Sequence, residues 1–204
     1  MMKSIETVAE LEAIYGEPRG ASLLKEVPSL TQGYRAFIAA APFVVMATSG
    51  SGGIDCSPKG DAPGFVQVID DHTIALPDRP GNNRIDNLRN LVEDPRISLL
   101  FVIPAVGETL RVVGRAKITA DEGMLARFTV GGKLPRTVIV IEIDSVYFHC
   151  SKALIRSKLW DTATWPERSD LPTGGAILAE IANGDFDGEA YDCELPARIA
   201  KTLY

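Results

Sequence analysis

The sequence has 204 residues, a formal net charge of −6 and a pI near 5.0, with 46% hydrophobic and 24% charged residues. Length and composition are typical of one globular domain with a sizeable core, and they exclude an intrinsically disordered chain. The acidic balance excludes a broad basic surface that would bind nucleic acid or an anionic membrane. The longest apolar run, residues 37–47, contains Pro42 and is too short to span a bilayer, so we expect no transmembrane segment.

The first 41 residues predict a helical segment that precedes the sheet. Residues 7–10 have the capping-box pattern, with Thr7 three positions before Glu10. Residues 30–41 have the spacing of an amphipathic helix that ends before Pro42. These residues also lack the continuous apolar stretch of a signal peptide.

The cysteines and histidines argue against disulfides and metal. The chain has three widely spaced cysteines, Cys56, Cys150 and Cys193, which form neither a disulfide framework nor paired ligands. Only two histidines occur, His72 and His149, too few for a histidine-rich zinc site. We therefore expect a cytoplasmic protein without a metal.

From residue 43 to residue 148, short β-branched and aromatic segments alternate with Gly, Asp and Pro turns. Such a pattern is typical of antiparallel sheets, and tight connections at 50–53 and 70–72 predict hairpins. Regular spacing of the segments favours a barrel. The strands are expected at residues 44–48, 54–57, 65–69, 73–76, 97–103, 109–118 and 136–148.

Two of these strands carry a readable pattern of faces. In the 109–118 strand, apolar side chains alternate with mostly cationic ones, so one face is expected to be buried and the other cationic. In the 136–148 strand, Ile139, Ile141, Ile143 and Tyr147 are expected on a common face.

Further helices are predicted between and after the strands. A helix at 84–93, with Asn83 as its N-cap, ends before Pro95, and a short helix follows at 121–128. Residues 151–160 predict a helical turn and residues 176–183 a helix. The last twenty residues give no clear pattern.

Familiar catalytic motifs are absent from the sequence. No G-x-S-x-G nucleophile elbow occurs, and the glycines at 50–53 and 131–132 complete neither a dinucleotide fingerprint nor a P-loop. The positive signal is residues 78–88, where Arg79, Arg84 and several asparagines gather at a predicted helix start. Arginine forks and helix N–H groups suit a phosphate. The alternative is a solvated helix start with asparagine caps.

Two other segments could contact a ligand. Ser57, Lys59 and Gly60 follow a strand and could meet a polar ring edge, or they form an ordinary Pro-Gly turn. Lys152, Arg156 and a turn later Trp160 would share one face of a helix. That face could contact a ligand, or it could be a basic helix with a core tryptophan.

The order of these parts resembles the pyridoxamine 5′-phosphate oxidase-like FMN-binding split-barrel superfamily across residues 37–160. The resemblance lies in residues 56–60, 82–88, 93–100 and 110–116, of which Asp94-Pro95-Arg96 and the 111–114 strand are the most specific. It implies a mainly β fold with flanking helices, a six-stranded antiparallel split barrel, and a homodimer with FMN at the interface. The single domain would comprise a helical segment at 1–41, a barrel core at 42–150 and a flavin-contacting helix and tail at 151–204.

The resemblance also implies roles for particular positions. Ser57, Lys59 and Gly60 would approach the isoalloxazine or ribityl chain. The residues implied around the phosphate are Arg79, Asn82, Asn83, Arg84 and Asn87. Thr109 and Arg111 would come from the neighbouring strand, and the C-terminal contacts implied by a subgroup of FMN-dependent enzymes are Lys152, Arg156 and Trp160. Thr109 stands where pyridoxamine phosphate oxidase usually has Gln, and no Arg-rich segment follows Trp160, so vitamin B6 oxidation is not expected.

The function expected from this resemblance is that of an FMN-dependent oxidoreductase, which acts on a small molecule by hydride transfer through the flavin. The alternative is a non-catalytic protein that binds or stores flavin, haem or deazaflavin. His149 is then the only strand-end imidazole available to a haem.

Overall fold

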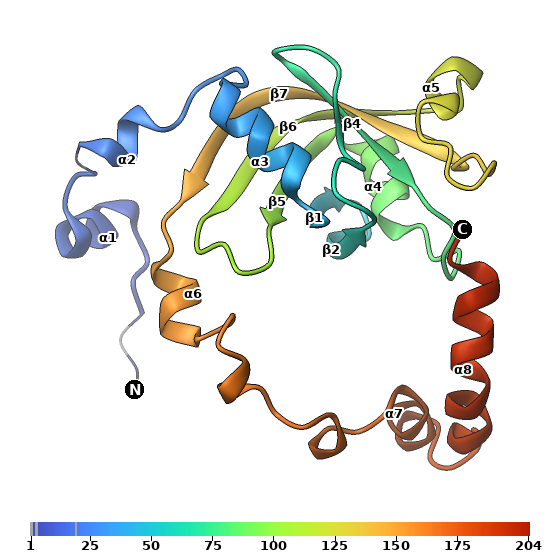
Figure 1. The fold of residues 1–204 in the computed structure, drawn as a ribbon. Helices are drawn as coiled ribbons and strands as arrows, with labels where there is room; N and C mark the ends of the chain where they lie inside the picture. Colours follow the sequence, from blue (N-terminus) through green and yellow to red (C-terminus); the bar gives the residue numbers. More distant parts are fainter. Residues whose placement is uncertain (1, 3, 19) are drawn as a thin grey trace.

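The computed structural model describes residues 2, 4–18 and 20–204. Within them, seven strands form one twisted antiparallel sheet with the order β2-β1-β5-β6-β7-β4-β3 (Figure 1). The strands are β1 Phe43–Gly50, β2 Gly53–Gly60, β3 Gln67–Val68, β4 Thr73–Asp78, β5 Arg96–Val102, β6 Thr109–Thr119 and β7 Thr137–His149. The helices are α1 Val8–Tyr15, α2 Ala21–Leu24, α3 Gln32–Ala40, α4 Asp86–Glu93, α5 Glu122–Ala126, α6 Lys152–Ser157, α7 Gly174–Ile181 and α8 Gly188–Thr202.

This architecture confirms the predicted fold class, an antiparallel split barrel with flanking helices. The edge strands β2 and β3 do not pair with each other, so the barrel is open. Six strands have six or more residues, as the resemblance implies, and the seventh, β3, has two and lies within the strand that the sequence pattern predicts at 65–69. The core lies between the sheet, α3 and α4, where Ile38 and Leu91 pack with Val44, Phe101 and other buried side chains.

The alternation predicted for β6 is confirmed. Leu110, Val112 and Ala116 are buried, whereas Arg115 and Lys117 are exposed on the other face. Each buried aliphatic side chain of this size contributes roughly 1.5–3 kcal/mol to folding, so the apolar face fixes the register of the strand.

The common face predicted for β7 is wrong at Tyr147. In the β6–β7 ladder, Val113 pairs with Ser145 and the next residue, Gly114, pairs with Ile143. The pairing therefore skips Asp144 of β7. This irregularity turns Tyr147 to the outer face, next to Arg111. A Cβ on Gly114 would lie 2.1 Å from a backbone oxygen of β7, and only glycine permits so close an approach.

The helix starts are partly as predicted. The capping box of α1 is present, and the side chain of Thr31 caps α3. Asn83 is not the N-cap of α4, because this helix begins at Asp86, after Ile85. Asn83 instead has a φ of +58° and accepts a hydrogen bond from Arg136. The predicted strand at 65–69 forms pairs only at Gln67–Val68.

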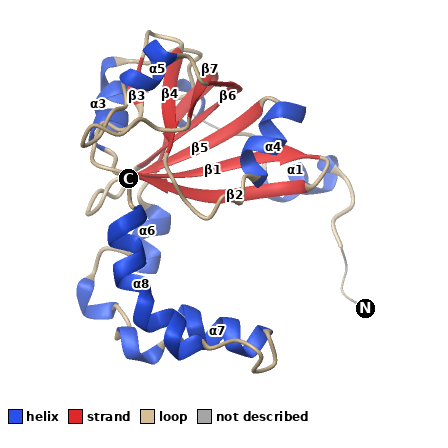
Figure 2. Cartoon of the chain, turned by 90° about the vertical axis from the view of Figure 1, so that its right-hand side faces the viewer, coloured by secondary structure: helices blue, strands red, loops and turns tan. Residues whose placement is uncertain are grey.

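Residues 151–204 form an arm that leaves the barrel at α6 and returns with α8 (Figures 1 and 2). The predicted helix at 151–160 ends at Ser157, because Lys158 adopts a left-handed conformation, so Trp160 does not share a helix face with Lys152 and Arg156. Helix α8 occupies most of the last twenty residues. Helices α7 and α8 pack on each other rather than on the sheet. Among the described residues, no helix is long and apolar enough to cross a membrane.

Candidate functional site

A hollow of about 210 Å³ lies where β4 leads into α4, beside the first residues of β7. We call it the β4–α4 hollow. Pairing of Asp78 with Thr137 in the β4–β7 ladder brings the loop after β4 next to Arg136. The hollow is lined by Lys59, Asp78, Arg79, Pro80, Gly81, Asn82, Asn83, Arg84, Ile85, Asn87, Leu88, Arg136 and Thr137.

Three of the four basic side chains that line the hollow have a carboxylate partner. Lys59 Nζ lies 3.2 Å from Asp78, and Arg79 Nε lies 2.7 Å from Asp61. Arg84 Nε lies 2.6 Å from Asp86, in an exposed pair.

Arg136 is the fourth, and within the described chain its side chain has no carboxylate partner. Its Nη1 donates a hydrogen bond of 2.7 Å to the amide oxygen of Asn83. Arg136 therefore keeps a full positive charge and most of its donors for a ligand.

Thr137 adds a second unused group to the hollow. Its hydroxyl is buried and has no hydrogen-bond partner among the residues that the structure describes. A buried hydroxyl without a partner costs roughly 1–3 kcal/mol. Sequence reasoning missed both residues, since no motif marks the start of β7 and only the pairing with β4 brings them to the hollow.

Two neighbouring hollows continue the site along β2. One, of about 460 Å³, includes Ser57, Lys59 and Asn87, and the other, of about 230 Å³, includes Gly60 and Arg79. Lys59 lines all three hollows. The structure thus brings together eight of the predicted site residues: Ser57, Lys59, Gly60, Arg79, Asn82, Asn83, Arg84 and Asn87.

The other five predicted residues do not line these hollows within the single chain. Thr109 and Arg111 lie on β6, and two strands, β1 and β5, separate β6 from β2. Lys152 and Arg156 lie on α6, beyond the end of β7, and Trp160 donates a 2.8 Å hydrogen bond to the carbonyl oxygen of Val106.

The β6 and β7 residues form a second polar group on the outer face of the sheet. Arg111 donates a 2.9 Å hydrogen bond to the hydroxyl of Tyr147, and Lys25 lies 5.4 Å from the centre of the same ring. Tyr147 also contacts His149, with ring centres 5.0 Å apart. Burial, together with the nearby charges of Arg111 and Lys25, lowers the pKa of His149, so the imidazole is neutral at pH 7. Its Nε2 is buried and has no hydrogen-bond partner in the described part of the chain.

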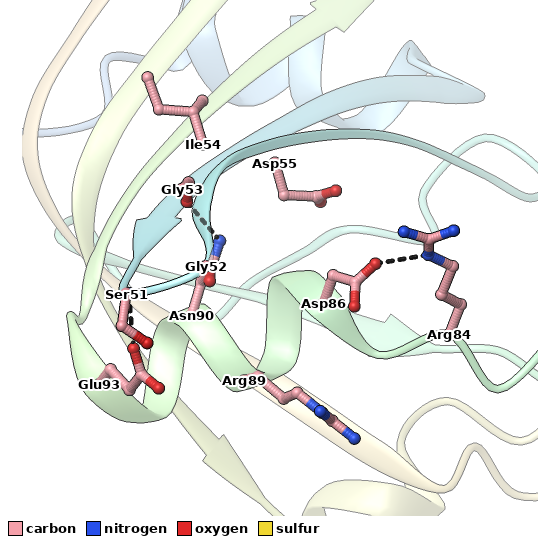
Figure 3. Close-up of a pocket in the computed structure, with 10 residues that line it drawn as sticks. All are labelled: Ser51, Gly52, Gly53, Ile54, Asp55, Arg84, Asp86, Arg89, Asn90 and Glu93. Carbon is pink, nitrogen blue, oxygen red and sulfur yellow. Dashed lines mark hydrogen bonds and ion pairs between the residues drawn. The ribbon is translucent and has the colours of Figure 1, made fainter.

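A further hollow of about 390 Å³ lies between the β1–β2 turn and α4 (Figure 3). Its polar groups bind one another: Asn90 donates to the carbonyl oxygen of Gly53, and Glu93 accepts from the N–H of Ser51. These contacts hold the hairpin against α4. No cluster of three potential metal ligands occurs among the residues that the structure describes.

The fold is an open antiparallel split barrel, and the β4–α4 hollow is lined by four basic side chains. The family model described as pyridoxamine 5′-phosphate oxidase matches residues 30–150. The chain therefore belongs to the pyridoxamine 5′-phosphate oxidase family, as the sequence resemblance predicts. This membership supports the flavin-binding split-barrel class for the protein.

Solved structures similar to this chain include HupZ from Group A Streptococcus, which is 20% identical, with 57% of this chain and 91% of that chain covered and a TM-score of 0.48. A Lactobacillus delbrueckii protein assigned to pyridoxamine 5′-phosphate oxidase is 17% identical over 60% of this chain and 98% of that chain, with a TM-score of 0.48. General stress protein 26 from Bacillus anthracis is 14% identical over 55% and 88%, with a TM-score of 0.43. No curated protein matches the chain.

Proposed function

We propose that this protein binds FMN, with the phosphate of the cofactor in the β4–α4 hollow. The observation that carries the proposal is the pair of unused groups at the start of β7: the guanidinium of Arg136, without a carboxylate, and the buried hydroxyl of Thr137. A phosphate dianion accepts hydrogen bonds from both kinds of group. Arg79, Arg84 and the amides of Asn82, Asn83 and Asn87 complete the proposed phosphate site.

The rest of the cofactor fits along β2. The hollow of about 460 Å³ beside Ser57 and Lys59 has the size of a small-ligand site and shares Lys59 with the lining of the proposed phosphate site. We therefore place the ribityl chain and the isoalloxazine there, near Ser57, Lys59 and the backbone of Gly60. Barrel residues 42–150 then form the flavin-binding core of one domain, with 1–41 and 151–204 as its extensions.

We further propose that the protein is a homodimer, because the part of the outer face formed by β1 and β5 is apolar. Val45 and Leu100 lie in register on this face, next to Arg111, and both are only half-buried. Phe43, at the start of β1, is 39% exposed. An antiparallel sheet with one solvated face normally shows polar residues there, and a contiguous apolar patch marks an interface.

A second subunit on this face would supply the site residues that a single chain leaves away from the hollows. These are the ones on β6, α6 and the following turn: Thr109, Arg111, Lys152, Arg156 and Trp160.

The reaction we propose is oxidation or reduction of a small organic molecule at the flavin, which supplies the hydride chemistry when bound. The residues of this chain bind the phosphate, orient the ring and exclude water from it. We propose a cytoplasmic location, which suits three exposed, unpaired cysteines.

A non-catalytic binding protein is the second candidate, and the state of His149 favours it. The neutral imidazole with an unpartnered Nε2 could serve as a haem ligand, and flavin or deazaflavin storage would need no substrate. An enzyme, by contrast, must turn over an electron donor.

The first experiment is the visible absorption spectrum of the purified protein, before and after denaturation and after addition of excess FMN. We expect flavin bands, release of FMN on denaturation and a dimer by size-exclusion chromatography with light scattering. A protein that contains no flavin and takes up no added FMN would overturn the proposal. A Soret band would favour haem. Turnover of NADH or NADPH with an artificial acceptor would support an enzyme, whereas tightly bound flavin without reduction would support storage.

A further inference from the structure

The arm formed by residues 151–204 returns to the barrel at Tyr204, next to the β4–α4 hollow. The Tyr204 hydroxyl donates a 2.6 Å hydrogen bond to Asp61 Oδ1, and Lys133 Nζ donates a 2.7 Å hydrogen bond to the main-chain oxygen of Tyr204. The Tyr204 ring lies 5.6 Å from the guanidinium carbon of Arg79, within the range of a cation–π contact. Tyr204, two residues beyond the end of α8, thus contacts both members of the Asp61–Arg79 ion pair.

Arg79, one member of this ion pair, lines the hollow. The side chains of Asp61 and Arg79 are 3% and 16% exposed, so solvent screens their interaction only weakly. Arg79 Nε binds Asp61, and Nη1 donates a 2.7 Å hydrogen bond to the carbonyl oxygen of Phe128. Within the described chain, Nη2 makes no hydrogen bond, so this nitrogen is free to donate to a ligand.

The Tyr204 hydroxyl affects how strongly the positive charge of Arg79 attracts a ligand, because Tyr204 and Arg79 both donate to Asp61. Asp61 is largely buried, which by itself raises its pKa, but hydrogen bonds from Tyr204, from the N–H of Ala62 and from Arg79 outweigh burial and lower it. The Asp61 carboxylate is therefore ionised, and it accepts hydrogen bonds from three donors. Without Tyr204, only the N–H of Ala62 and Arg79 would donate to Asp61, so its negative charge would act more strongly on Arg79 and on any anion in the hollow.

We infer that Tyr204 is a positioning residue for the phosphate site, holding Asp61 so that Arg79 remains available to a phosphate monoester. The inference rests on the proposed function, since it concerns the same hollow. It gives the arm a role that lies outside residues 30–150, the part matched by the family. The ligand class follows from the chemistry of Arg79: a dianionic phosphate gains from a free guanidinium nitrogen, and a neutral ligand does not.

The test compares FMN with riboflavin, which is the same ring system without the phosphate. Dissociation constants are measured by quenching of flavin fluorescence for the full-length protein and for Tyr204→Phe, which removes only the hydroxyl. We expect Tyr204→Phe to weaken FMN binding roughly three- to tenfold, the span of one net hydrogen bond, with riboflavin binding changed by less than about twofold. The matched control is Tyr15→Phe, since Tyr15 is 79% exposed on α1.

A second variant, Lys133→Met, removes the hydrogen bond from Lys133 to the main chain of Tyr204. It should weaken FMN binding, and not riboflavin binding, in the same way. Equal weakening of FMN and riboflavin by Tyr204→Phe would overturn the inference, because it would indicate a general structural role. Unchanged FMN binding in Tyr204→Phe and Lys133→Met would overturn it as well. Failure of the unmodified protein to bind FMN would overturn the proposed function instead, so the two failures are distinguishable.

Discussion

Replacement of Arg136 by alanine is the sharpest test of the phosphate site. Among the four cations of the β4–α4 hollow, Arg136 is the one without a carboxylate partner in the described chain, so its loss leaves no buried acid behind. A hydrogen bond to a charged group contributes about 1.5–3 kcal/mol, and about 1.4 kcal/mol corresponds to a tenfold change in Kd. We therefore expect Arg136→Ala to weaken FMN binding roughly ten- to a hundredfold, with little change in stability.

The assay is titration of the protein with FMN and riboflavin, followed by flavin fluorescence. Arg115→Ala is the matched control, because Arg115 is exposed on β6 and lines none of the hollows along β2. Riboflavin affinity should be nearly the same in both variants and in the unmodified protein. If Arg136→Ala binds FMN as tightly as Arg115→Ala does, the phosphate is not in this hollow and the reasoning is refuted.

Three further predictions concern the barrel. Gly114→Ala should lower the free energy of unfolding by about 1–3 kcal/mol, because the added Cβ would collide with the β7 backbone. Gly52→Ala is the control, since a Cβ there would lie in open space. Equal urea midpoints for the two variants would contradict this prediction. Burial lowers the pKa of His149 below its ordinary 6.5, so the unfolded chain binds more protons than the folded chain. The free energy of unfolding should therefore fall as the pH drops below about 6.5. In urea melts, His149→Gln should flatten this fall. Leu100→Asp, on the outer face, should give a monomer by light scattering, whereas Val92→Asp, with Val92 79% exposed on α4, should leave a dimer.

Local sequence patterns predict most of the barrel correctly. The alternation in β6 identifies its buried face, and the tight connections at 50–53 and 70–72 lie at observed turns between strands. The capping box at Thr7 also forms as its sequence predicts. Each of these features depends on neighbours within a few residues, so the sequence alone contains the information.

Predictions fail where a distant segment intervenes. Asn83 has the composition of a helix cap, but its amide oxygen instead accepts from Arg136, fifty-three residues away. Tyr147 has the spacing of a buried face, yet the pairing of β7 with β6 skips a residue and turns it outward. Helix α8 contains Pro196 and no buried side chain, so it lacks the apolar stripe by which helices are recognised.

The candidate site likewise contains residues that the local sequence predicts and residues that only the tertiary structure brings to it. The arginines and amides of residues 78–88 follow one another along the chain, so their composition alone indicates an anion site. Arg136 and Thr137 reach the hollow only because Thr137 pairs with Asp78 across two antiparallel strands, and Tyr204 reaches Arg79 of its lining only because the arm returns to the barrel. The sequence by itself thus determined the elements and the chemistry of one loop. Tertiary structure decided which distant side chains join that loop, because cross-strand register and chain return are set by packing of the whole core.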